Sequence, residues 1–183
     1  MKKAIIASAI TLAVFSGAAN AAGDLNAGTF DLNFSGTVST TTCALEPTIN
    51  GVGGKNDIAL GQTDVNTLGK KVDVVFKPTA AGATGCAANN GANEFIMQWN
   101  AVGSSFETAG LKAASGAAGN SHVQIESVNA TTGNGTFITQ DGFQFTFPKA
   151  AVTGAGLQYK VALMGGDQVG DMTATAQVKH WYK

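Results

Sequence analysis

The sequence predicts an all-β fold, an antiparallel β-sandwich forming a single domain behind an export signal. Short runs of alternating apolar and polar residues recur along the chain, and turn formers separate them, among them many of the 24 glycines. No later segment sustains the 3.6-residue period of a helix. With 44% hydrophobic and 13% charged residues, a chain of 183 residues can bury one core but is too short for two ordinary domains.

The first 21 residues read as a Sec-type signal peptide. Lys2 and Lys3 precede an apolar run over residues 4–15, and small residues follow up to Ala21. The apolar run is too short to span a bilayer, and no later run is long enough to replace it. We therefore expect cleavage after Ala21 and a mature product that is exported and soluble.

Composition argues against a nucleic-acid binder. The formal net charge is −1, and all 11 basic residues are lysines. Without arginine the chain lacks the bidentate contacts to bases and phosphates that such proteins use. We expect no nucleic acid among its partners.

Two cysteines, Cys43 and Cys86, predict one disulfide, because export takes them to an oxidising compartment. The alternatives, a metal ligand or a nucleophile, require partner residues, and no histidine lies near either cysteine in the sequence. A loop of this length should stabilise the fold by about 4 kcal/mol in the chain-entropy model.

Nine segments are predicted as strands. They are residues 29–42, 57–61, 71–77, 94–100, 122–128, 135–140, 143–147, 157–165 and 172–182. The segments at 78–85 and 110–121 are rich in glycine and alanine and are expected to be surface loops, either passive connections or binding surfaces.

Both ends of the predicted domain carry strand-like alternation. From Met172 to Tyr182 the pattern runs to the penultimate residue, so we expect the end of this strand to be held by something. Near the start, Phe30, Leu32 and Phe34 alternate with polar residues, and Gly28 falls in the apolar frame. An ordinary first strand would explain the alternation alone, but not the glycine where a packing side chain is expected.

With these features in their order, the sequence resembles the chaperone–usher fimbrial subunits (pilins), of the type 1-like and enterotoxigenic kind. The similarity rests on the signal peptide, the extension with Gly28, "NFSGTVSTTTCALEP" around Cys43, Cys86, "DIALGQTDV", "VDVVFKPTAAG", and a C-terminal pattern with Gly170 fourteenth from the end and Tyr182 penultimate. It spans essentially the whole mature chain.

The resemblance implies an incomplete immunoglobulin-like sandwich that lacks its last strand and so leaves a groove beside the C-terminal strand. A periplasmic chaperone would lend a strand to the groove and hold the terminal carboxylate, and at an outer-membrane usher a neighbouring subunit would replace it. Residues 1–21 would be the signal peptide, 22–35 the donor-strand extension and 36–183 the pilin domain. The product would be a fimbria on the bacterial cell surface that supports adhesion.

The resemblance also assigns roles to residues. In the donor strand Phe30, Leu32 and Phe34 would insert into the next groove, with Gly28 where a pocket must stay free of a side chain. The residues expected at the groove and the chaperone contact are Gly170, Val178, His180, Tyr182 and Lys183. His180 takes an inward position that more often holds an aliphatic residue, either as a satisfied, partly buried neutral imidazole or as a pH-sensitive one.

An enzyme is the first rival interpretation. His122 and His180 are the only histidines, and the chain has no G-x-S-x-G sequence or metal-spaced cluster. The carboxylates that could form a catalytic pair are scattered along the chain. They are Glu94, Glu107, Glu126 and Asp141. We expect no catalytic residues, no metal and no cofactor.

A subunit that itself binds host glycan receptors is the second rival, with a minor adaptor subunit as a further alternative. Trp99, Phe106, Lys112 and Lys149 could contribute to a glycan site. Aromatic residues in strands more often belong to the core, so the structural subunit remains the favoured prediction.

Overall fold

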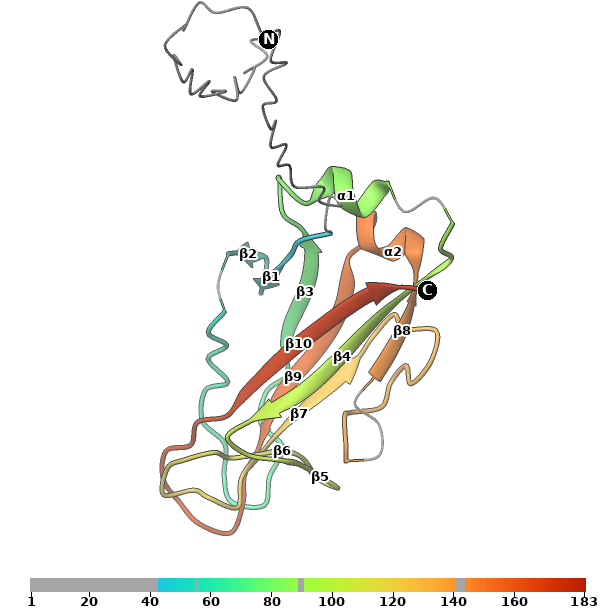
Figure 1. Cartoon of the computed structure of the whole chain (residues 1–183). Helices are drawn as coiled ribbons and strands as arrows, with labels where there is room; N and C mark the ends of the chain where they lie inside the picture. The colour runs from blue at the N-terminus through green and yellow to red at the C-terminus, as the bar shows by residue number, and fades with distance from the viewer. Residues whose placement is uncertain (1–42, 55, 89–90, 141–143) are drawn as a thin grey trace, which may run out of the picture. The chain divides into compact units, whose positions relative to one another are not determined.

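The computed structural model describes residues 43–54, 56–88, 91–140 and 144–183, which all lie in one unit of the chain, Ser39–Lys183. The predicted signal peptide and donor extension fall outside the described residues. Within the described part, ten strands and two short helices, α1 (Ala83–Ala87) and α2 (Lys149–Thr153), form the unit (Figure 1). The strands form two antiparallel sheets, so the predicted β-sandwich is confirmed.

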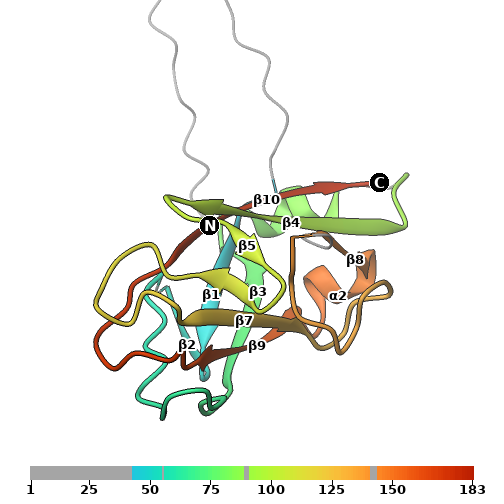
Figure 2. The same cartoon turned by 90° about the horizontal axis from the view of Figure 1, so that it is seen from below.

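The two sheets differ in size. The larger has the strand order β2 (Val52–Gly53), β1 (Leu45–Ile49), β3 (Val72–Pro78), β9 (Leu157–Met164), β7 (His122–Ser127), β6 (Gly110–Lys112) and β5 (Phe106–Glu107). The smaller has the order β10 (Thr175–Tyr182), β4 (Glu94–Val102) and β8 (Gln144–Pro148). Figure 2 shows β4 and β10 in one layer and β1, β3, β7 and β9 in the other.

The core lies between the sheets because alternate side chains of each strand point inward. Tyr159 of β9 stands at its centre, and its ring makes edge-to-face contacts with Trp99 at 5.2 Å and Phe147 at 5.6 Å between centroids. Such pairs add about 0.5–1.5 kcal/mol each beyond the area that they bury. Burial raises the pKa of the Tyr159 hydroxyl far above its ordinary value.

Most of the predicted strands are confirmed with small shifts at their ends, but two are wrong. Residues 57–61 form no strand, although Ile58 and Leu60 pack against the core. Residues 135–140 form no strand and contribute only single bridge residues, Phe137 opposite Glu126 and Thr139, although Ile138 is fully buried. In both places alternation reported which side chains are buried, whereas a strand also needs a neighbouring backbone to bond. The predicted strand 29–42 lies outside the described residues.

The sequence patterns did not predict several short elements. Strand β1 contains Pro47, which cannot donate a ladder hydrogen bond, yet it pairs with β3 from Leu45 opposite Pro78 to Ile49 opposite Val74. The segment at 78–85, expected to be a loop, contains the first residues of α1. The expected loop at 110–121 begins with β6. None of the helices in the described ranges has the length and apolar character needed to cross a membrane.

Candidate functional site

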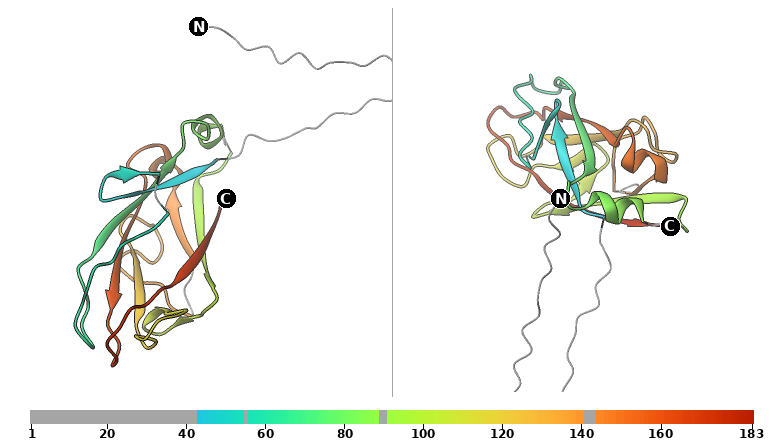
Figure 3. Two further views of the ribbon diagram at one scale, coloured as in Figure 1. Left: turned by 90° about the vertical axis from the view of Figure 1, so that its left-hand side faces the viewer. Right: turned by 90° about the horizontal axis from the view of Figure 1, so that it is seen from above.

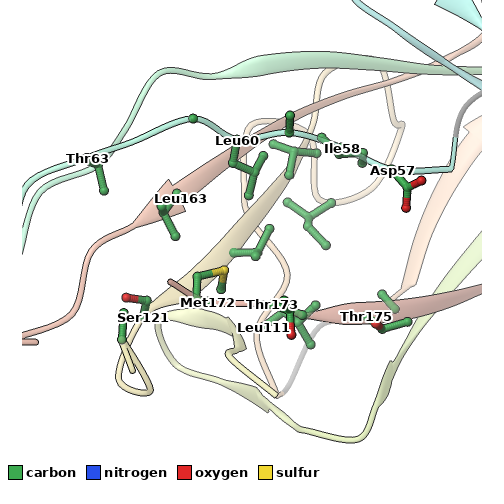
Figure 4. Close-up of a pocket in the computed structure, with 18 of the residues that line it drawn as sticks. Asp57, Ile58, Leu60, Thr63, Leu111, Ser121, Leu163, Met172, Thr173 and Thr175 are labelled. Atoms are coloured by element: carbon green, nitrogen blue, oxygen red, sulfur yellow. The ribbon is translucent and has the colours of Figure 1, made fainter. Parts of the chain in front are cut away.

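A long groove opens along β10, with a volume of about 1640 Å³. One wall is the irregular segment at residues 56–65 together with Leu45 and Pro47 of β1, and the other is β10 with the stretch that leads into it. In Figure 4, Ile58 and Leu60 point into this space from one side, and Leu111 and Met172 lie on the other. The groove reaches the core, because the buried side chains of Met97 and Trp99 line its floor.

Strand β10 is an edge strand along this groove. It pairs with β4 over its whole length, from Thr175 opposite Val102 to Tyr182 opposite Phe95. Among the described residues no strand pairs with its other side, where β1 of the larger sheet lies across the groove. An open edge beside an apolar groove is a template for a further strand.

The side chains of β10 that face the groove are small or half-buried. Ala174, just before the strand, and Ala176 and Val178 within it are packed against the core and line the groove. Their small volume leaves space for the side chains of an added strand. The sequence placed Val178 at this groove, and it lies there.

The end of β10 is tied to a disulfide. Cys43 and Cys86 are joined, as predicted, with sulfur atoms 2.06 Å apart. The hydroxyl of Tyr182 donates a hydrogen bond of 2.7 Å to the main-chain oxygen of Cys86, and its ring packs edge-on against Phe95 at 4.8 Å. Partial burial raises the pKa of Tyr182 above its ordinary value.

His180 differs from the expectation of partial burial, because the structure leaves the residue exposed. Its imidazole Nε2 lies 2.8 Å from the main-chain oxygen of Cys43, and its ring stacks on Phe95 with centroids 5.5 Å apart. The residue is therefore satisfied, as expected, but at the rim of the groove.

Lys183 and Gly170 lie at opposite ends of the C-terminal segment. The main-chain oxygen of Lys183 accepts hydrogen bonds from the N–H groups of Asn93 at 3.2 Å and Glu94 at 3.1 Å, which holds the end of the predicted strand. Gly170 lines the groove before β10 begins. Its φ is +146°, and a Cβ there would lie 2.5 Å from that of Ala117, so this position requires glycine.

The four residues considered for glycan binding do not form one site. Trp99 is only 5% exposed and belongs to the core, the alternative favoured for aromatic residues in strands, and Phe106 lies on β5 opposite Leu111 of β6. Lys112 pairs with Glu107 near β5 and β6, at the lower end of Figure 1, whereas Lys149 begins α2 at the upper end.

Two of the four carboxylates considered for catalysis, Glu107 and Glu126, form ion pairs, and Asp141 lies outside the described residues. Glu107 lies 3.1 Å from His122 Nε2 and 3.0 Å from Lys112 Nζ, and these hydrogen bonds, that of His122 foremost, lower the pKa of Glu107. Glu126 pairs with Lys71. Both glutamates are half-buried on strands near the surface, where ion pairs contribute little to stability.

The structure adds groove residues that the sequence reading did not assign. Ile58 and Leu60 form much of the wall opposite β10. The alternation of "DIALG" carries the signal for this wall, but alternation alone predicts an ordinary strand. Phe76 of β3 also lines the groove and packs edge-on against Trp99 at 5.8 Å.

Comparison with known proteins finds similarity to fimbrial proteins. No family model matches the chain. The K99 fimbrial protein of Escherichia coli is 30% identical over 136 residues, which are 74% of this chain and 69% of that protein. The F107 fimbrial protein of Escherichia coli is 27% identical over 183 residues, the whole length of both chains.

Proposed function

The chain belongs to the fimbrial protein family, and from this premise we propose that it is a pilus subunit that polymerises by donor-strand exchange. Proteins of this family are structural and not enzymatic, and their place is the surface fimbria. The proposal concerns the mechanism of assembly, the chain's partners and its role in bacterial adhesion.

The open edge of β10 beside the groove is the observation that carries the proposal. An immunoglobulin-like sandwich that lacks its last strand would leave such an edge beside its penultimate strand. The core residues Met97 and Trp99 reach the floor of the groove, so a strand laid there would complete the core as well as the sheet. Without this added strand, the subunit would expose unpaired backbone groups along β10 and the apolar surface of the groove, both of which favour aggregation.

The occupant proposed for the mature fimbria is residues 22–35 of the next subunit. Its alternate residues Phe30, Leu32 and Phe34 would enter the groove between the walls formed by Ile58 and Val178. Three large apolar side chains at about 1.5–3 kcal/mol each would contribute about 4–9 kcal/mol of packing free energy. With the main-chain ladder added, dissociation would be very slow.

Before assembly, a periplasmic chaperone would occupy the same edge, and an outer-membrane usher would be the place of exchange. Val178, His180 and Tyr182 on β10, Gly170 before it and Lys183 after it are the proposed contact region. The role of Gly28 is to leave one pocket free for the incoming strand.

A subunit that donates at one end and accepts at the other makes a heterologous contact, which does not close into a ring. The product is a filament. The filament supports adhesion by extending away from the cell surface, whether this chain forms the shaft or an adaptor.

The test uses the mature subunit with residues 22–35 deleted, co-expressed with its chaperone and then challenged with a synthetic peptide of residues 22–35. The expected result is recovery only as a chaperone complex, release of the chaperone by the peptide and a sharp rise in melting temperature. A matched peptide with Phe30, Leu32 and Phe34 changed to serine should do neither. A deleted subunit that is stable and monomeric without any strand would refute the proposal.

A further inference from the structure

Large apolar side chains gather at the end of the domain opposite the helices. Val65, Leu68 and Val169 are 45%, 42% and 84% exposed, and together we name them the apolar tip. In Figures 1 and 3 (left) their loops, residues 61–71 and 165–174, lie at the lower end, far from α1 and α2. Val65 and Val169 also line the groove, so the tip borders the groove where β10 begins.

The tip is held on a firmly packed backbone. The N–H of Asn66 donates to the oxygen of Gly166, and the N–H of Gly165 to that of Thr67, both at 3.0 Å. A Cβ on Gly165 would lie 2.2 Å from the oxygen of Asp64, which shows how closely the two loops approach. Exposed side chains on such a backbone lose little freedom when a partner covers them.

A shallow pocket of about 470 Å³ lies at the other end, between α1 and α2. Its lining is mainly small and apolar. The lining residues are Cys86, Ala87, Ala92, Asn93, Pro148, Lys149, Ala150 and Thr153. Figure 3 (right) looks onto this end of the domain, beside the described start of the chain at Cys43.

Strand addition would bring these two ends together in successive copies. An antiparallel ladder is slightly more stable than a parallel one, and in that direction the donor's residue 35 would lie where β10 begins, beside the apolar tip. The seven residues 36–42 then separate the donor strand from Cys43 of its own domain. They span at most about 25 Å, so the helix end of the donor copy must lie close to the tip of the acceptor.

We propose that the apolar tip of one subunit, with Val169 foremost, seats in the α1–α2 pocket of the next copy of this chain. This rests on the proposed donor-strand exchange and adds a domain-to-domain contact to it. The tip and the pocket of one copy lie at opposite ends, so the contact forms only between copies and continues along a filament. Asp167 and Asp171 near the tip and Lys149 at the pocket have complementary charges.

The first test is Leu68→Ser in the full chain, assembled with its native partners, because Leu68 is the tip residue that does not line the groove. We expect subunit ladders that resist SDS at wild-type length, because strand exchange is intact, together with a several-fold loss of filament stiffness in electron micrographs. Val52→Ser is the matched control, since Val52 is a 54% exposed valine on β2 outside both the tip and the pocket. Wild-type stiffness in Leu68→Ser filaments would count against the contact, whereas a lost ladder in wild type would count against strand exchange itself.

A second test does not depend on filament shape. Val169→Cys combined with Ala150→Cys should allow a short bismaleimide to cross-link successive subunits in purified filaments, giving covalent dimers that survive boiling in SDS. Val52→Cys combined with Ala150→Cys should not. Equal cross-linking by the two pairs, or none by the first, would overturn the assignment of the pocket to the tip.

Discussion

Tyr182 reaches across from β10 to Cys86, and its hydroxyl donates a 2.7 Å hydrogen bond to the main-chain oxygen of that residue. His180 makes the corresponding contact with the oxygen of Cys43, the other half of the disulfide. The strand that borders the groove is therefore anchored at one end by the disulfide. This anchor holds β10 in place, and among the described residues no strand pairs with its other edge.

Removing the anchor should weaken the domain and its capture by the chaperone. Tyr182→Phe deletes the hydrogen bond but keeps the ring against Phe95, and should lower the free energy of unfolding by about 0.5–1.5 kcal/mol. Tyr182→Ala also removes the ring packing and should reduce periplasmic yield further. Denaturant unfolding of the peptide-complemented subunit measures the first effect, and an unchanged yield of Tyr182→Ala would argue against a role in capture.

Gly170→Ala should destabilise the loop that leads into β10. The position has φ +146°, and the new methyl group would meet Ala117, so we expect a loss of about 1–3 kcal/mol. Gly119→Ala is the control, because its Cβ would approach only the oxygen of Gly116, at 3.9 Å. Melting temperatures of the peptide-complemented variants would distinguish them, and equal values would show that the loop relaxes without cost.

Gly28→Leu should slow polymerisation without harming the subunit–chaperone complex. The leucine would bring a side chain to the pocket that the incoming strand is proposed to leave empty. A time course of SDS-resistant ladders measures the rate, with Gly23→Leu as a control in the same extension but outside its alternating stretch. Assembly of Gly28→Leu at the wild-type rate would contradict this role.

Glu107 should contribute to stability against acid. Hydrogen bonds from His122 and then Lys112 hold the pKa of its carboxyl below the ordinary 4.5. Because the folded-state pKa is depressed, this contribution is present above pH 4.5 and is lost as pH falls through the lower folded value. Glu107→Gln should therefore flatten the fall in unfolding midpoint below pH 4.5, whereas Glu46→Gln serves as the control on β1. A parallel fall in wild type and Glu107→Gln would exclude the effect.

The sequence by itself determined the elements that alternation and chemistry fix locally. Its period-two pattern predicted β3, β4, β7, β8, β9 and β10, and the export signal together with two cysteines predicted the disulfide. The resemblance to fimbrial subunits assigned Val178 to the groove, and Val178 lines the groove in the structure. The strand and disulfide predictions hold because they depend on neighbouring residues or on a single pairing.

Only the tertiary structure decided where a backbone partner is present. Alternation in 57–61 looks like that of β3, but the segment forms a wall of the groove and no strand, since burial of Ile58 and Leu60 requires no ladder. Strand pairing places Trp99 opposite the groove residue Val178, where it is buried, whereas Trp181 on the other face of the same sheet is 39% exposed. The apolar tip likewise emerges from two distant loops, and the sequence carries no signal for the hydrogen bonds that bring them together.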